Sequence, residues 1–245
     1  MSKVKFPMNP WADGPCNGDL WIPQVDKVRI DRENLRMAED DPRRVHYTTP
    51  KGKPYLPAGW SGNPWKAPIL LLLLNPAYSE SPDIVYEDPE AYERARNAVV
   101  GNWDAKYPNP YLHPKLRSLD SWCAKVPCSG LHKHLVESGM EEEAAWQRVS
   151  QKIALVELSP WASYRWSPAA FVETTKVSVE LARLAMEDAN RIVLLGRGES
   201  DWKSAGLLDV DTLPVSKGVR MHQSRITKGN FPTVWDHLTA EVEKP

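Results

Sequence analysis

The chain of 245 residues has few cysteines, no long apolar run and no excess of charge of one sign. Its three cysteines, Cys16, Cys123 and Cys128, are odd in number and match no zinc or iron–sulfur spacing, which indicates free thiols in a reducing, cytoplasmic compartment. The longest apolar run is much shorter than a membrane span, and the segment from Met1 to Pro10 has no signal-peptide apolar region. We therefore expect no membrane partner.

Several motifs of common enzyme families are also missing. There is no Walker A loop and no Gly-x-Ser-x-Gly elbow, so nucleotide hydrolysis and ordinary serine esterase chemistry lack support. Gly196-x-Gly198 follows an apolar segment, but Ser200 and Asp201 stand where a dinucleotide fold needs its third glycine. His132-x-His134 has no further ligand at a suitable spacing and is more typical of a helix surface. We expect neither a metal nor a cofactor.

The composition that is present fits one α/β domain of ordinary size. Hydrophobic residues make up 42% of the chain and charged residues 26%, as in globular proteins generally. Residues 1–66 are rich in Pro, Gly, Asp and Arg with little periodicity, which predicts an irregular N-terminal arm packed on a main domain at residues 67–245. Tryptophan is frequent, with 11 residues against 3 Phe, and we assign most of these rings to the core or to loops.

Apolar runs alternate with segments of helical periodicity from Pro68 onward. This alternation predicts a three-layer α/β/α fold around a central, mainly parallel, four-stranded sheet. The Pro-rich and aromatic-rich residues 102–130 predict a structured loop. The predicted strands are residues 69–74, 153–158, 191–195 and 219–221, and the predicted helices are residues 89–100, 141–151, 169–189, 201–205 and a final helix opened by Pro232.

The most informative segment is the apolar run Ile69–Leu74, bounded by Pro68 and Asn75-Pro76. A short uninterrupted apolar run predicts a strand buried on both faces. Pro76 ends the ladder because it has no N–H to donate. Asn75 is thereby placed at the carboxyl end of a buried strand, where open α/β sheets bind ligands.

Polar groups follow the other predicted strands as well. Glu157 and Ser159 end the second strand, and Arg197 follows the third. If these strands are neighbours, the groups converge at one rim of the sheet. A fourth polar loop contains His222, Ser224, Arg225 and Lys228, within a stretch from Lys203 to Asn230 that has five cations and two acids. A histidine among cations suits a loop that meets phosphate or an anionic transition state, although a solvated surface loop has the same composition.

Taken together, these segments resemble the uracil-DNA glycosylase superfamily. Leu73-Leu-Asn-Pro-Ala77 is similar to the Gly-x-Asn-Pro-Gly motif of its mismatch-specific branch, and His222-Gln-Ser224 to its His-Pro-Ser loop. The segment Leu155–Trp161 falls where the family has a strand that contacts the target base, and the resemblance covers roughly residues 68–240. Leu73 and Ala77 replace both glycines, Gln223 replaces the proline, and no Asp adjoins Pro76. These departures favour a base other than plain uracil.

The resemblance implies a DNA glycosylase that hydrolyses the N-glycosidic bond of a flipped noncanonical base. A modified cytosine of phage DNA, such as glucosylated hydroxymethylcytosine, is favoured over uracil, and DNA is the expected partner of a cytoplasmic monomer. Glu157 suits an amino pyrimidine if it faces the pocket, and is a salt-bridge partner if it lies on the other face. The implied catalytic residues are Asn75 and His222, the base-binding residues are Tyr78, Glu157, Trp161 and Tyr164, and the DNA-backbone residues are Ser79, Arg197, Ser224, Arg225 and Lys228.

The sequence also allows two other interpretations. One is a hydrolase of a free nucleoside or small glycoside on the same fold, which predicts an enclosed acidic pocket in place of a basic groove. The other is a non-catalytic nucleic-acid-binding protein that uses its cations and exposed rings, for which Asn75→Ala changes nothing.

Overall fold

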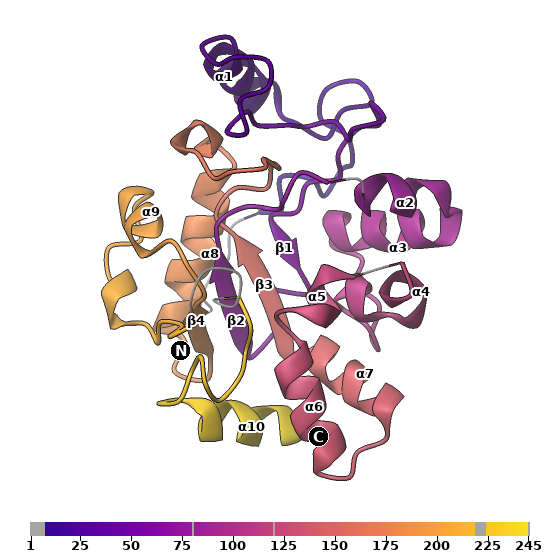
Figure 1. The fold of residues 1–245 in the computed structure, drawn as a ribbon, viewed down its shortest axis with the longest axis vertical. Helices are drawn as coiled ribbons and strands as arrows, with labels where there is room; N and C mark the ends of the chain where they lie inside the picture. Colours follow the sequence, from indigo (N-terminus) through magenta and orange to yellow (C-terminus); the bar gives the residue numbers. More distant parts are fainter. Residues whose placement is uncertain (1–7, 80, 120, 219–223, 245) are drawn as a thin grey trace.

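The computed structural model describes residues 8–79, 81–119, 121–218 and 224–244. It is an α/β fold with a four-stranded mixed sheet in the order β1-β3-β2-β4 and ten α-helices in the described part of the chain (Figure 1). The parallel strands are β2 (Ile69–Leu73), β3 (Ile153–Glu157) and β4 (Ile192–Leu195), and the short edge strand β1 (Trp60–Ser61) runs antiparallel to β3.

Strand β2 is the centre of the sheet, as its apolar run predicts. Leu71 is the register partner of Leu155 on β3 and of Leu194 on β4, and all five residues of β2 have no exposed surface. A strand with neighbours on both edges and helices on both faces must be apolar at every position. The predicted strands 69–74, 153–158 and 191–195 are confirmed to within one residue at each end.

The fourth strand differs from the prediction. The segment 219–221 lies outside the described residues, and the fourth strand of the sheet is β1, from within the predicted N-terminal arm. A two-residue strand is too short to give a period-2 pattern, so the sequence offers no signal for it.

Helices cover both faces of the sheet. Ile69, Leu71 and Leu73 pack against apolar residues of four helices on one face, and Leu70 and Leu72 pack against two helices on the other. The first face is covered by α5 (Trp122–Lys125), α6 (Ser129–Glu137), α7 (Glu142–Lys152) and α10 (Trp235–Glu243), and the second by α8 (Thr175–Glu187) and α9 (Glu199–Ser204).

The starts of helices α3 (Pro89–Val100) and α8 have local causes. Helix α3 begins where predicted, because the Asp88 side chain accepts from two N–H groups of its first turn, and it ends at Gly101 in a left-handed conformation. The predicted helix 169–189 begins later, at Thr175, because Pro168–Ala170 form a 3-10 turn. Shorter elements are α2 (Ser81–Glu87), α4 (Pro114–Arg117) and the 3-10 turns η1 (Pro110–Leu112), η2 (Pro168–Ala170) and η3 (Val210–Thr212). The predicted loop 102–130 therefore contains several short helices.

The N-terminal segment packs on the main body but is not irregular throughout. It contains helix α1 (Gln24–Asn34), at one extremity of the molecule in Figure 1. Helix α1 has no apolar stripe that could have predicted it, because it buries only Asp26 and Ile30. Trp11, Trp21 and Ile30 belong to a core cluster shared with α3 and α8. None of the helices in the described part of the chain combines the length and apolarity that a membrane span needs.

Candidate functional site

The carboxyl ends of the three parallel strands are neighbours. Leu73 at the end of β2 is the register partner of Glu157 at the end of β3. On the other side, the backbone N–H of Gly196, which follows β4, donates to the Leu72 carbonyl at 3.0 Å. The three strands are therefore neighbours, which is the condition under which Asn75, Glu157 and the Gly196–Gly198 turn share one rim of the sheet.

Asn75 is buried and fixed just beyond β2. Its Nδ2 donates to Ser163 Oγ at 2.9 Å and to the Pro76 carbonyl at 3.0 Å. The chain beyond β2 and the chain beyond β3 remain side by side, since the Ser163 N–H donates to the Pro76 carbonyl and the Tyr78 N–H to the Ser163 carbonyl. The amide is thus held in one orientation by two partners, although the ladder itself has ended.

Glu157 occupies the sheet face that is covered by α5, α6, α7 and α10. It lies on the same side of β3 as Ile153 and Leu155, four and two residues earlier, and these belong to that core cluster. The residue is 8% exposed, and its Oε2 is buried with no hydrogen-bond partner among the described residues. Burial raises the pKa of the carboxyl to about 8, and the charge of Arg197 opposes this only in part. At neutral pH this raised pKa favours the protonated form of Glu157.

Arg197 approaches the rim from β4. Its Nε is also buried without a hydrogen-bond partner in the part of the chain that the structure describes. The turn that carries it needs glycine at position 198, where φ is +81° and a Cβ would overlap the Leu74 side chain. A Cβ at Gly196 would lie 2.9 Å from Leu73 Cδ2. The glycines bring Arg197 close to the ends of β2 and β3.

Two of the predicted base-binding rings lie at the rim in an aromatic cluster. The Tyr78 ring stacks on the His46 imidazole, with centroids 3.7 Å apart, and meets Tyr164 edge-on at 5.0 Å. Tyr164 is 66% exposed, and Tyr78 and His46 are half-buried. His46 belongs to the N-terminal segment, and neither it nor Ser163 was predicted, because nothing in the local sequence indicates that they reach Asn75 and Tyr78.

Trp161 cannot bind a flipped base, and its predicted role is wrong. Its side chain has no exposed surface. Its Nε1 donates to Asp26 Oδ2 at 3.3 Å, and its ring lies edge-on to Trp11. Trp161 therefore points into the core beneath the N-terminal segment and belongs to the packing between this segment and the body.

The polar loop after Val215 is described in part. Val215 pairs with Leu195 and continues past the end of β4, so this loop leaves from the same rim. His222 lies outside the described residues. Ser224 is buried, Arg225 is half-buried with a buried Nε that has no partner in the described ranges, and Lys228 is exposed. Ser79, on the first loop, is half-buried.

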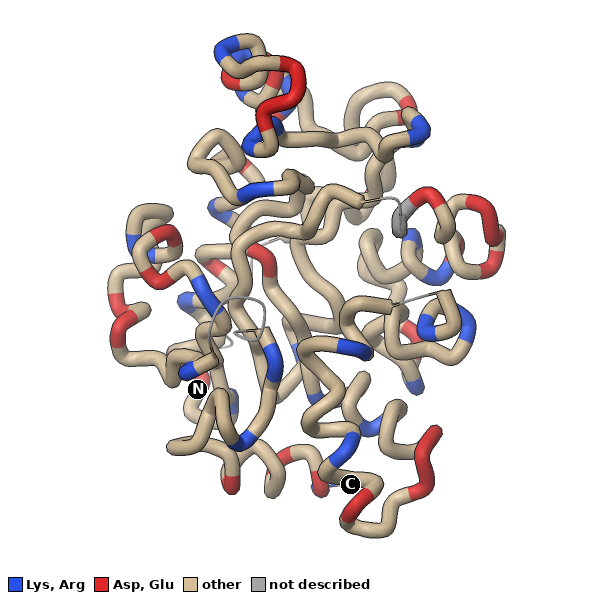
Figure 2. The backbone as a smooth tube through the Cα atoms, in the orientation of Figure 1, with Lys and Arg blue, Asp and Glu red and all other residues tan. Residues whose placement is uncertain are grey.

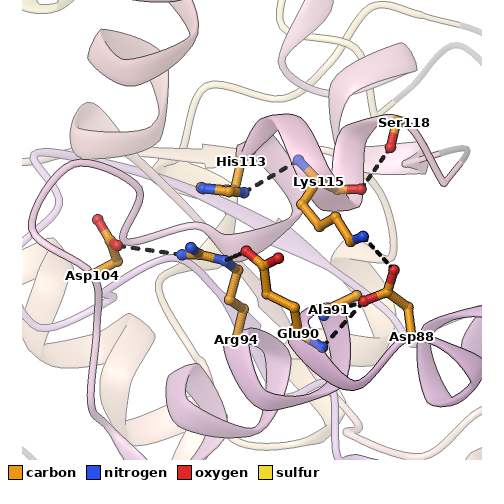
Figure 3. A network of polar contacts seen from close by, with 8 residues as sticks. All are labelled: Asp88, Glu90, Ala91, Arg94, Asp104, His113, Lys115 and Ser118. Carbon is orange, nitrogen blue, oxygen red and sulfur yellow. Dashed lines mark hydrogen bonds and ion pairs between the residues drawn. The ribbon is translucent and has the colours of Figure 1, made fainter.

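Two cavities lie away from this rim. One of about 390 Å³ is next to α3, and its charged groups are paired: Arg94 Nε is 3.1 Å from Glu90 and its guanidinium 3.5 Å from Asp104, while His113 Nδ1 accepts from the Lys115 N–H (Figure 3). The other, of about 570 Å³, is at the amino ends of the strands. Because the charged groups around the cavity next to α3 are paired with one another, they form a structural network.

Cationic and acidic residues are interspersed along the described backbone. Figure 2 shows Lys and Arg dispersed among Asp and Glu along the backbone, in keeping with the net charge of -1. Any affinity for an anionic ligand must therefore come from particular side chains such as Arg197, and not from the overall field. No group of His, Cys, Asp and Glu among the described residues could hold a metal ion.

Comparison with protein-family models, with curated proteins and with solved structures finds no match. Functional inference for this chain therefore depends on the geometry of the rim and on the motif resemblance.

Proposed function

We propose that this chain is a DNA glycosylase with a uracil-DNA glycosylase-like fold, which hydrolyses the N-glycosidic bond of a flipped noncanonical base and leaves an abasic site. The support is the position of Asn75-Pro76, in a motif that resembles the family's, at the carboxyl end of a central parallel strand. The base leaves the helix stack at a cost of about a few kcal/mol, and in this proposal it is received at the rim.

The observation that carries the proposal is the buried carboxyl of Glu157, with an unpartnered Oε2, at the same rim as Arg197, whose buried Nε is also unpartnered and whose charge acts on that carboxyl. Unsatisfied buried polar atoms are costly and need a reason. A base placed here supplies the missing partners. It also leaves with negative charge, which the Arg197 guanidinium stabilises in the transition state. A neutral carboxyl donates one hydrogen bond and can protonate the departing base as a general acid.

Glu157 is compatible with a cytosine-type base at any pH. In the neutral form it pairs with the edge of either pyrimidine, because it has one donor and one acceptor. When ionised it accepts from the exocyclic amine of cytosine but repels the O4 carbonyl of uracil. A cytosine-type base is thus accepted in both protonation states. Together with the sequence departures from the uracil-excising motifs, this makes a modified cytosine, such as glucosylated hydroxymethylcytosine of phage DNA, the proposed substrate.

Asn75 orients the water that attacks the sugar. Its Nδ2 is engaged by Ser163 and by the Pro76 carbonyl, so the amide plane is fixed and its Oδ1 serves as the acceptor for the water. His222, Ser224, Arg225 and Lys228 belong to the loop that, by the resemblance, contacts the leaving base and the DNA backbone. Ser79 holds the backbone from the first loop.

The test is a screen of duplex and single-stranded DNA containing uracil, hydroxymethylcytosine or glucosylated hydroxymethylcytosine, assayed for strand cleavage after alkali. We expect alkali-labile sites with a modified cytosine, and a loss of about 10²-fold or more in Asn75→Ala and Glu157→Gln. Asn190→Ala, at the opposite rim, is the matched control. No cleavage of any substrate, with release of base from free nucleosides instead, would favour a small-molecule hydrolase.

A further inference from the structure

A fixed aromatic cluster lies directly beside Asn75. It comprises His46, Tyr78 and Tyr164, which we call the rim platform. Asn75 donates to the side chain of Ser163, and the next residue, Tyr164, places its ring 5.0 Å from Tyr78 and 6.3 Å from His46. The platform therefore begins one residue away from the partner of the proposed catalytic amide.

Backbone hydrogen bonds from three separate segments hold these rings. The His46 N–H donates to the Ala162 carbonyl at 2.8 Å, and the Ala162 N–H donates to the His46 carbonyl at 3.3 Å. The Tyr78 N–H donates to Ser163, and the Arg165 N–H to the Pro42 carbonyl at 2.8 Å. Rings that are ordered before a ligand arrives lose little conformational entropy when they stack on it.

Tyr164 is too exposed to serve mainly as a packing residue. With 66% of its surface accessible, the ring gives little burial and has surface available for stacking on another flat group. Burial, and to a smaller extent the charge of Arg44, lowers the pKa of the His46 imidazole.

Cations flank the platform. Arg165 follows Tyr164 and is exposed, and Arg44 is close enough to act on His46. Arg43 is also on this segment but is paired with Asp41 at 2.6 Å. Aromatic rings beside cations are the combination that binds single-stranded nucleic acid without sequence preference, because every base has a face to stack and every nucleotide a phosphate.

We propose that His46, Tyr78 and Tyr164 form a stacking platform for an unpaired nucleotide that adjoins the flipped one, so that the chain binds single-stranded or locally unpaired DNA. This inference extends the proposed function, since it names the form of DNA that the rim receives. It gives the N-terminal segment a direct part in substrate binding through His46.

The test measures binding and needs no excision. A fluorescent, unmodified single-stranded oligonucleotide is titrated with the protein and followed by anisotropy at low salt. We expect Tyr164→Ala to weaken binding about tenfold, whereas Tyr164→Phe, which keeps the ring, stays within about twofold of the wild type. His46→Phe keeps a flat ring and should also bind, while Trp122→Ala removes an exposed ring on α5 and serves as the control.

The outcomes separate the two proposals. If no substrate is excised but Tyr164→Ala still weakens oligonucleotide binding, the platform stands and the glycosylase proposal fails. If a modified base is excised while Tyr164→Ala binds the oligonucleotide as the wild type does, the platform proposal is overturned. An equal loss in Trp122→Ala would also overturn it, because binding would then not depend on this cluster.

Discussion

Glu157 is a carboxyl group in an environment that opposes its ionisation. Its pKa is raised to about 8 in the folded protein and returns to about 4.3 when the chain unfolds. Between these values the unfolded state has lost the proton and the native state keeps it, so native stability falls as the pH rises. Below the lower value both states are protonated and this penalty disappears.

The first prediction concerns this penalty. We expect the free energy of unfolding of the wild type to fall by up to about 1.4 kcal/mol per pH unit between pH 5 and 8 through this group. Glu157→Gln, which cannot ionise, should lack this dependence and become the more stable protein at pH 9. Urea unfolding at several pH values measures it, and Glu180→Gln on the surface of α8 is the control. Parallel curves for wild type and Glu157→Gln would contradict the assignment.

A second prediction at this scale uses Arg197. If the neutral form of Glu157 is the active one, excision declines above its pKa. Arg197 lowers that pKa, so Arg197→Gln should reduce the maximal rate and move the alkaline limb of the pH–rate profile to higher pH. Arg197→Lys keeps the charge and should leave the limb near its wild-type position. A limb that moves to lower pH in Arg197→Gln would exclude this coupling.

At the scale of the element, helix α3 depends on its first turn. Asp88 accepts from the N–H groups of Glu90 and Ala91 and is paired with Lys115 Nζ at 2.5 Å (Figure 3). We expect Asp88→Ala to lower the free energy of unfolding by about 1 kcal/mol, because both N–H groups lose their acceptor. Glu93→Ala, exposed on the same helix, should change it by about 0.5 kcal/mol or less. Equal effects in the two variants would show that the cap contributes nothing.

The elements also show what the sequence could and could not indicate. Strand β2 was predictable because its apolar residues are contiguous, and α3 because its cap precedes a proline. Strand β1 and helix α1 were not, since neither has a periodic apolar pattern. Their positions are decided by tertiary contacts with β3 and with the core around Trp161.

The residues of the candidate site also divide into those that the sequence indicates and those that it does not. Asn75, Glu157 and Arg197 were predictable from the ends of apolar runs, and the strand order brings them together. The face of Glu157 could not be chosen from the sequence, because it depends on the register with Leu73. The position of Trp161 after an apolar run suggested a ligand-binding ring. The sequence does not show that the N-terminal segment packs over this ring and buries it.

At the scale of the whole molecule, Asp26 links the N-terminal segment to the body. Its carboxylate accepts from Trp161 Nε1, from the Glu173 N–H at 2.8 Å and from the Thr174 hydroxyl at 2.6 Å. Three donors converge on one buried side chain of α1. The segment and the body are therefore one cooperative unit in this region.

Asp26→Asn tests this link. The amide would turn its own N–H groups toward one of these donors, so we expect a loss of about 1–3 kcal/mol in the free energy of unfolding and faster limited proteolysis within residues 8–50. Asp40→Asn, exposed on the same segment, should do neither. Unchanged proteolysis of Asp26→Asn would mean that apolar packing alone holds the segment.

This link also has a consequence for synthesis of the chain. Asp26 leaves the ribosome long before Glu173 and Thr174, and a translation rate of about 5–20 residues per second makes the interval roughly 7–30 s. Throughout that delay Trp11, Trp21 and Ile30 have none of their later partners from α8 and stay accessible to chaperones, so the nascent chain is at its most vulnerable before the second half emerges.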